Sequence, residues 1–150
     1  MAAPPSSGGD PVTSKRQLVE WLEVGVKPKS AWRVGTEHEK FVFRLSDLRR
    51  APYEGPDGIG ALLNTIADRF GWRRIEENGA TIALTRNDCN ITLEPGGQFE
   101  LSGAPVETLH DTCAEANLHL KESLAVCADL GLGMLGVGFD PLGRIDEMPW

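Results

Sequence analysis

Four glutamates stand in two short strings, Thr36-Glu37-His38-Glu39 and Leu93-Glu94-Pro95-Gly96-Gly97-Gln98-Phe99-Glu100. Both strings have the composition of a β-strand, and residues i and i+2 of a strand point to the same side, so Glu37 and Glu39 share one face. Glu94 and Glu100 flank a Pro-Gly-Gly turn. If the chain folds back or bulges at this turn, all four carboxylates can meet in one pocket.

Carboxylates packed that closely repel one another, and a divalent cation is the simplest counter-charge. Oxygen ligands without Cys or His select Mg²⁺, Mn²⁺ or Ca²⁺ rather than zinc. The alternative is an ordinary solvated strand face, as most Glu-x-Glu pairs are. Phe41 and Phe43 fall on the same side as the first pair and favour a concave wall. We therefore expect Glu37, Glu39, Glu94 and Glu100 to bind metal.

The residues between these acids have less specific roles. Gln98 lies on the Glu100 face by alternation, so it can touch substrate or nucleotide or make a structural hydrogen bond. Gly96 and Gly97 are interpreted as turn formers. His38 points away from the glutamates, and His110 and His119 are expected at the surface. We assign no catalytic base.

Two longer strings carry a resemblance to a known family. Gly35-Thr36-Glu37-His38-Glu39-Lys40-Phe41 and the run from Leu93 to Pro105 resemble the glutamate-cysteine ligases of the plant and proteobacterial type. The likeness continues through Glu107-Thr108-Leu109-His110 and from Gly133 to Pro141, and covers about residues 13–150. The specificity of the Glu-Pro-Gly-Gly-Gln-Phe-Glu string makes a chance match a poor explanation.

This resemblance implies a glutamine-synthetase-like fold and an ATP-dependent reaction. The glutamate γ-carboxylate would join the cysteine amine through γ-glutamyl phosphate, giving γ-glutamylcysteine, the first step of glutathione synthesis. It also assigns Mg²⁺ or Mn²⁺ to the four glutamates. Family members are several times longer, so we expect residues 13–150 to be the amino-terminal part of one catalytic domain. The phosphate-clamping arginines are expected beyond Trp150, and residues 1–150 alone should be inactive.

Three alternatives remain open. A ligase of the same fold could use another amine acceptor. A metal-dependent hydrolase could use the same carboxylates without nucleotide, although the lack of His ligands counts against it. A Ca²⁺-binding module without catalysis is the third, and the loop spacing of an EF-hand is absent.

Composition narrows the class of partners. A formal net charge of -7 argues against nucleic acid. Arg49-Arg50 and Arg73-Arg74 are interpreted as solvated surface pairs. No run approaches the roughly 18 apolar residues of a membrane helix, and residues 1–12 are expected to be a flexible tail without a targeting pattern. The family resemblance implies small-molecule partners, namely glutamate, cysteine and ATP.

Three cysteines in a chain without a signal sequence indicate a reducing compartment. The cytoplasm is the expected location, with a plastid left open for a plant protein. Cys89 is expected in a turn, where it is either redox-sensitive or an inert thiol. Cys113 and Cys127 are expected on one helix, too far apart to form a disulfide.

Periodicity predicts the elements that position these residues. Helices are expected from Ser14 to Gly25, over residues 59–70 and from Pro105 to Gly131. Strands are expected over residues 32–45, over 72–76, 80–85 and 90–94 as a meander, and over 132–139 as a central strand before a turn at 140–143. The buried stripe of the last helix should comprise Leu109, Cys113, Ala116, Leu120, Leu124 and Cys127. The predicted fold is α+β, an antiparallel curved sheet with flanking helices on one side.

Overall fold

The protein is described by a computed structural model that covers residues 10–147 and falls into two compact units, divided between Trp32 and Arg33. In the first unit, α1 (Lys15–Glu23) begins at the predicted Ser14 with a capping box: the Ser14 hydroxyl accepts from the Gln17 backbone N–H, and the Gln17 side chain accepts from the Ser14 N–H. The 3₁₀ turn η1 (Lys29–Ala31) follows. Of the predicted tail, residues 1–9 lie outside the described residues, and residues 10–12 form no helix or strand.

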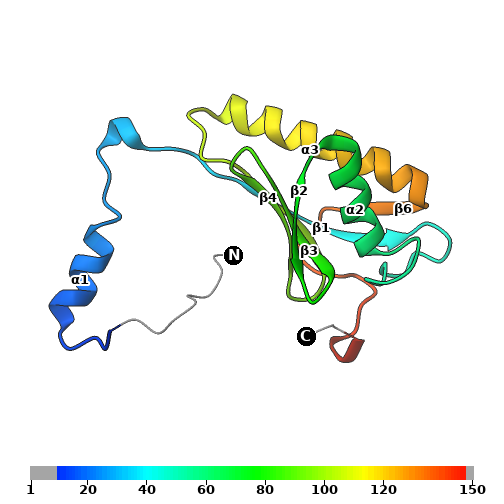
Figure 1. The fold of residues 1–150 in the computed structure, drawn as a ribbon, viewed down its shortest axis with the longest axis horizontal. Helices are drawn as coiled ribbons and strands as arrows, with labels where there is room; N and C mark the ends of the chain where they lie inside the picture. Colours follow the sequence, from blue (N-terminus) through cyan, green and yellow to red (C-terminus); the bar gives the residue numbers. More distant parts are fainter. Residues whose placement is uncertain (1–9, 148–150) are drawn as a thin grey trace. The chain divides into compact units, whose positions relative to one another are not determined.

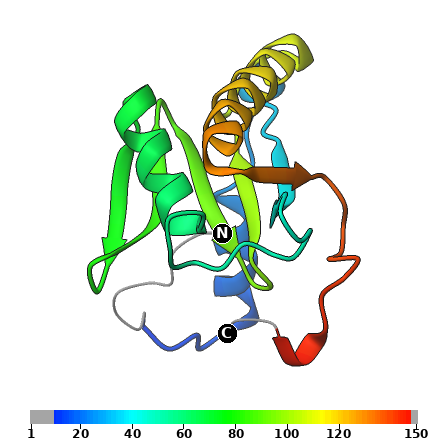
Figure 2. The ribbon, with the colours of Figure 1, turned by 90° about the vertical axis from the view of Figure 1, so that its right-hand side faces the viewer.

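The second unit is a six-stranded sheet with two helices on one face (Figures 1 and 2). The strands pair antiparallel in the order β2-β3-β4-β5-β1-β6. The two helices, α2 and α3, pack against each other. In addition, α2 packs against β2 and β3, and α3 packs against β6. The predicted α+β fold is confirmed. The element bounds are β1 (Glu37–Arg44), α2 (Ile59–Phe70), β2 (Arg73–Glu77), β3 (Ala80–Arg86), β4 (Cys89–Glu94), β5 (Gln98–Ser102), α3 (Leu109–Leu130), β6 (Leu132–Leu135) and the 3₁₀ turn η2 (Ile145–Glu147).

Local sequence signals explain α2 and the meander that follows it. Apolar residues recur along α2 at spacings of three and four, and Ile59, Leu62, Leu63 and Ile66 are buried; Gly71 ends the helix with a left-handed φ of 70°. Asn78 and Gly79 turn the chain between β2 and β3, and Asn87 and Asp88 turn it between β3 and β4, all with positive φ. The ends of β2, β3 and β4 each lie within one residue of the predicted ranges.

The hydrophobic core lies between the sheet and the two helices. One face of the strands contributes Val42, Leu84, Ile91, Phe99 and Leu101, and the helices contribute residues such as Leu62, Ile66 and Val126. Because strand side chains alternate, the intervening residues of β1, β4 and β5 face the other side of the sheet. This second face, away from the helices, carries the acidic residues.

The long helix α3 corrects two predictions. It begins at Leu109 rather than Pro105, because Thr108 and Asp111 form a capping box. The predicted stripe was also wrong: Leu109 is 68% exposed and Leu124 48% exposed, and of its six residues only Cys127 is buried. The face that packs inward is unexpectedly polar and comprises Thr112, His119, Glu122, Ser123, Val126 and Cys127.

His119 also corrects its predicted place at the surface, since it is 3% exposed. Its ring stacks on Phe99 with a centroid distance of 5.9 Å. Helical periodicity alone selects the more apolar stripe, whereas packing against α2, β6 and Phe99 of β5 brings a polar stripe inward.

The bounds of β6 and β1 also differ from the predicted ranges. Residues 132–139 were predicted as a central strand, but β6 stops at Leu135 and lies at the sheet edge, where it pairs only with β1. Apolar residues on both faces of an edge strand mislead such a prediction. β1 spans Glu37–Arg44, shorter than the predicted 32–45, with Val34 making only an isolated bridge to Val106.

Candidate functional site

The predicted glutamates lie on the sheet face opposite the helices, here called the acidic face: Glu37, Glu39, Glu94, Gln98 and Glu100. Glu39 of β1 pairs with Glu100 of β5, and Glu94 of β4 pairs with Gln98 of β5. Directly paired residues project to the same side of an antiparallel sheet. Three neighbouring strands therefore bring together Glu39, Glu94 and Glu100, while Glu37 pairs with Ser102 farther along β1.

The turn at residues 95–97 makes this arrangement possible. It joins β4 to β5 as a tight hairpin, closed by a 2.8 Å hydrogen bond from the Gly97 N–H to the Glu94 carbonyl. Gly96 and Gly97 have φ values of 89° and 80°, a region that residues with a side chain rarely adopt. The interpretation of these glycines as turn formers is confirmed.

Hydrogen bonds from neutral groups orient two of the carboxylates. Gln98 Nε2 donates to Glu39 Oε2 at 2.8 Å, and Ser102 Oγ donates to Glu100 Oε1 at 2.7 Å. The first of these is the structural hydrogen bond that was one of two expectations for Gln98. Glu100 is 3% exposed, whereas Glu37 and Glu39 are exposed at the surface of the sheet.

Charge accumulates on the acidic face. The pKa of Glu94 is raised above its usual value, first by burial and then by its hydrogen bond with Glu100 and the charges of Glu100 and Glu39. A carboxyl with a raised pKa among other carboxyls is one that a cation would stabilise in its ionised form.

The donor set of the acidic face suits a hard cation, because every candidate ligand is an oxygen atom. Within residues 10–147, however, no three His, Cys, Asp or Glu side chains are arranged as a group that could hold a metal ion. The assignment of Glu37, Glu39, Glu94 and Glu100 to a metal therefore stays a prediction.

Behind the acidic face, β1 sends His38 and Lys40 toward α3. Lys40 is 5% exposed, and its ammonium donates to the His38 carbonyl at 2.7 Å. Burial lowers the pKa of Lys40 to about 8, against the opposing effect of the nearby Glu100 charge. Burial likewise lowers the pKa of His119 to about 3, with contributions from Lys40, His38 and Arg86. His38 thus faces away from the glutamates, as expected.

Two arginines predicted to be solvated are instead engaged in the fold. The Arg50 side chain is 20% exposed and pairs with Asp140 at 2.6 Å. Arg74 is 31% exposed and bonds to Asn64 and Asp68. The partners of both arginines come from other segments of the chain, so the adjacent sequence gave no signal of them. Arg49 and Arg73 are exposed, as expected.

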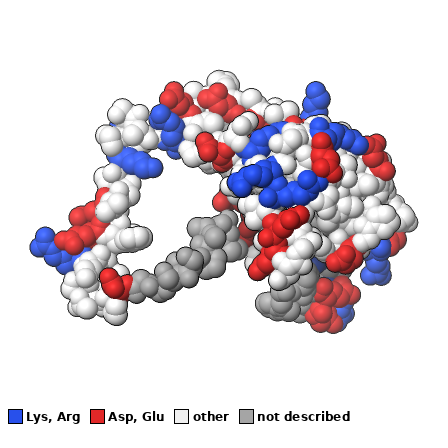
Figure 3. Space-filling view, in the orientation of Figure 1, with Lys and Arg blue, Asp and Glu red and all other residues white. Residues whose placement is uncertain are grey.

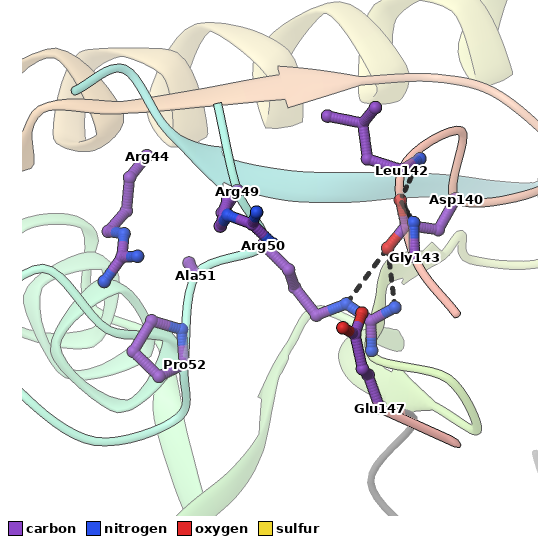
Figure 4. A pocket seen from close by; sticks show the side chains of 9 residues that line it. All are labelled: Arg44, Arg49, Arg50, Ala51, Pro52, Asp140, Leu142, Gly143 and Glu147. Atoms are coloured by element: carbon purple, nitrogen blue, oxygen red, sulfur yellow. Dashed lines mark hydrogen bonds and ion pairs between the residues drawn. The ribbon is translucent and has the colours of Figure 1, made fainter. Parts of the chain in front are cut away.

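Arg50 and Asp140 border a pocket of about 270 Å³ near the end of β1 (Figure 4). Figure 4 shows the guanidinium of Arg50 reaching toward the Asp140 carboxylate, while Arg44 and Arg49 approach from β1 and the segment after it. The pocket is lined by Arg44, Arg49, Arg50, Ala51, Pro52, Asp140, Leu142, Gly143 and Glu147.

The cysteines carry free thiols. Cys89 is the first residue of β4 rather than part of the preceding turn, and its half-buried thiol donates to Glu115 Oε1 at 3.0 Å. Burial, followed by this contact with Glu115, raises the pKa of Cys89 to about 11. A thiol held protonated is a poor nucleophile, which favours the inert alternative.

None of the helices in the described part of the chain is long and apolar enough to cross a membrane. On the face seen in Figure 3, acidic and basic side chains are interspersed over the helix-and-sheet unit.

Comparison with known proteins places the chain in a family. The sequence model of glutamate-cysteine ligase family 2 (GCS2) matches residues 33–149, beginning where the second compact unit begins. The chain is 47% identical over 152 residues to the chloroplastic glutamate-cysteine ligase of Brassica juncea, covering 99% of this chain and 29% of that protein. It is 48% identical over 152 residues to the Medicago truncatula counterpart, with the same coverages.

A rice relative gives the same result. Glutamate-cysteine ligase A of Oryza sativa subsp. japonica, also chloroplastic, is 48% identical over 151 residues, covering 99% of this chain and 30% of that protein. The chain thus spans about three tenths of the length of the curated relatives it matches. By the extent of the family match and the level of identity, the chain belongs to glutamate-cysteine ligase family 2.

Proposed function

We propose that the acidic face serves an ATP-dependent ligase that joins the γ-carboxylate of glutamate to the amine of cysteine, giving γ-glutamylcysteine for glutathione synthesis. The observation that supports this most is the meeting of Glu39, Glu94 and Glu100 on three adjacent strands, in a chain of this family. The chain covers about three tenths of its relatives, so the activity is proposed for the full-length protein.

The chemistry explains the need for acids. A carboxylate is a poor electrophile, so it must be activated, and attack of the γ-carboxylate on the γ-phosphate of ATP would give γ-glutamyl phosphate. The cysteine amine would then displace phosphate. Both reactants of the first step are anions that repel each other, and Mg²⁺ or Mn²⁺ would screen that repulsion when bound.

The residues of this chain would then have distinct tasks. Glu39, Glu94 and Glu100 would hold the cation, with Glu37 contributing from the exposed end of the same face. Gln98 would hold Glu39 by its hydrogen bond, and contact with substrate or nucleotide is its alternative role. Ser102 keeps one oxygen of the buried Glu100 in place.

The remaining parts of the site belong to other regions of the protein in this proposal. Arginines that clamp the phosphates and the substrate carboxylate would lie beyond Trp150, and residues 13–150 would be the amino-terminal part of the catalytic domain. Residues 1–150 alone would therefore not turn over substrate.

The expected location is an aqueous compartment with reduced thiols. The relatives from Brassica, Medicago and rice are named chloroplastic, which supports a plastid location in a plant host. The cytoplasm, expected from the sequence, remains a prediction. Fluorescence microscopy of the full-length protein fused at its C-terminus to a fluorescent protein would decide between them.

The test is coupled detection of ADP from the full-length protein with Mg²⁺. ADP should form only when glutamate and cysteine are both present, and γ-glutamylcysteine should appear in equal amount by mass spectrometry. Replacing cysteine in turn with other small amines tests for a different acceptor. Hydrolysis of phosphate or amide compounds without ATP, or no ADP with both substrates, would contradict the proposal.

A further inference from the structure

The hairpin between Glu94 and Gln98 has a neighbouring side chain from outside its own strands. Two successive residues with positive φ, Gly96 and Gly97, form most of the turn. Glycine has the widest backbone freedom of any residue, so such a turn does not by itself fix the side chains that flank it. The β4–β5 ladder and the hydrogen bond from the Gly97 N–H to the Glu94 carbonyl hold the backbone, and a neighbouring side chain can restrict the turn further.

Arg50 is that neighbour. A Cβ atom built at Gly97 would lie 3.8 Å from both Cδ and Nη1 of Arg50, so the arginine side chain lies beside the turn. The backbone of Arg50 is itself fixed to β1 by a bridge to Phe43, and the Ala51 N–H donates to the Val42 carbonyl at 3.0 Å. Arg50 thus links β1 to the β4–β5 turn.

Asp140 fixes the guanidinium. Arg50 Nε and Nη2 both donate to Asp140 Oδ2, at 3.1 and 2.6 Å, as Figure 4 shows. The other oxygen, Oδ1, accepts from the backbone N–H groups of Leu142 and Gly143 at 3.0 and 2.8 Å. These hydrogen bonds lower the pKa of Asp140 despite the opposing effect of burial, so the carboxylate is ionised at neutral pH.

Because Gly143 has no side chain, the Arg50 and Asp140 side chains can meet beside it. A Cβ at this position would approach Arg50 Nη2 to 2.8 Å and would come closer still to the Asp140 carboxylate. A side chain larger than hydrogen would therefore displace the pair without removing either charge.

We propose that Arg50, held by Asp140, is a positioning residue that fixes the turn at residues 95–97 and thereby the place of Glu94 on the acidic face. This inference rests on the proposed cation-binding role of that face. Arg50 lies beside the turn and is not one of the proposed cation ligands, so it would act through Glu94. The pair joins β1, the hairpin and the segment after β6, which are far apart in sequence.

The sign of the effect separates positioning from simple electrostatics. Removing a positive charge near carboxylates should strengthen the binding of a cation if charge alone mattered. If Arg50 positions Glu94, its loss should weaken binding, by about tenfold or more as for other residues that orient metal ligands. The two readings therefore predict opposite shifts.

The experiment measures Mn²⁺ dissociation constants by electron paramagnetic resonance on the full-length protein and its variants. Arg50→Met and Gly143→Ala should each weaken Mn²⁺ binding about tenfold, and Arg50→Lys should restore part of the loss. The control is Arg74→Met, another half-buried and ion-paired arginine, which should lower stability and leave the dissociation constant unchanged. Unfolding curves of each variant confirm that folded protein is compared.

The outcomes also separate this inference from the proposed function. If Glu100→Gln leaves Mn²⁺ binding unchanged, the acidic face does not hold the cation and both proposals fail. If Glu100→Gln weakens binding but Arg50→Met binds Mn²⁺ as tightly as the parent protein or more tightly, the positioning role alone is overturned.

Discussion

Carboxylates on the two sides of the sheet have different hydrogen-bond partners. On the helix-covered face, Glu122 is 8% exposed and is matched by Arg86, whose Nη2 lies 2.8 Å from Glu122 Oε2. Trp72 donates to the same carboxylate at 3.1 Å, and the Arg86 guanidinium stacks over its ring. On the acidic face, Glu39 of β1 and Glu100 of the neighbouring strand β5 accept hydrogen bonds from the neutral side chains of Gln98 and Ser102.

This difference separates a stabilising role from a proposed functional one. A buried carboxylate matched by a guanidinium is satisfied within the fold. Carboxylates gathered with neutral donors keep a negative potential that a cation can meet. Within β1 alone the contrast is between neighbours, since Glu37 and Glu39 face one side and His38 and Lys40 the other.

The largest effect should come from the acidic face itself. Glu39→Gln, Glu94→Gln and Glu100→Gln should each lower kcat/KM of the full-length enzyme on the order of a hundredfold, because each removes a proposed cation ligand. Steady-state assays with varied Mg²⁺ provide the measurement. Glu77→Gln, at an exposed site on β2, is the matched control. A loss of only a few-fold would return the acidic face to an ordinary solvated surface.

Glu37 tests how far the site extends. It is exposed and lies beyond the Glu39–Glu100 pair, opposite Ser102. We expect Glu37→Gln to cost about tenfold in kcat/KM, less than its three neighbours. A loss equal to that of Glu100→Gln would make it a full member of the site, against this expectation.

On the helix-covered face, the same kind of change should act on stability instead. Arg86→Met leaves Glu122 without its guanidinium, and breaking such a buried pair should cost about 3 kcal/mol of unfolding free energy. Urea denaturation measures this. The Mg²⁺ concentration for half-maximal activity should not change. A change would contradict the proposal that the helix-covered face stabilises the fold and the acidic face binds the cation.

His119 should make stability depend on pH. Its pKa is about 3 in the folded protein against an ordinary 6.5, so the unfolded chain binds one more proton between these values. Stability is therefore fully present above about pH 6.5 and is lost as pH falls toward 3, with a slope of up to about 1.4 kcal/mol per pH unit. His119→Leu should flatten this slope in urea denaturation between pH 4 and 6. An unchanged slope would mean that other groups cause the loss.

The smallest effect concerns Cys89. Burial and the contact with Glu115 hold its pKa at about 11, so alkylation by iodoacetamide at pH 8 should be slow. The exposed Cys113 should be labelled well before it. Mass spectrometry of tryptic peptides over time measures both rates, and rapid labelling of Cys89 in folded protein would contradict the structure.

Local chemistry could be predicted from the sequence, and the way elements pack could not. The cap at Ser14, the end of α2 at Gly71 and the Asn-Gly turn each depend on a few adjacent residues. The acidic strings were found because strand alternation and a Pro-Gly-Gly turn define a shared face. The order of the strands that contain these strings is known only from the structure.

The misses have a tertiary cause. His119 lies on a polar stripe of α3 that packs on Phe99, whereas periodicity selected the stripe of Leu109 and Leu124. Arg50 was taken for solvated surface because its partner, Asp140, is 90 residues away. Contacts of that kind are decided by the whole fold and leave no local pattern.

The central claim is that the carboxylates of the acidic face hold a divalent cation together with nucleotide. A crystal structure of the full-length protein with Mg²⁺ and a non-hydrolysable ATP analogue tests it most directly. We predict Mg²⁺ bound at about 2.1 Å by oxygens of Glu39, Glu94 or Glu100 and by phosphate oxygens. Mg²⁺ and nucleotide bound at another surface, with these glutamates surrounded only by water, would contradict the account.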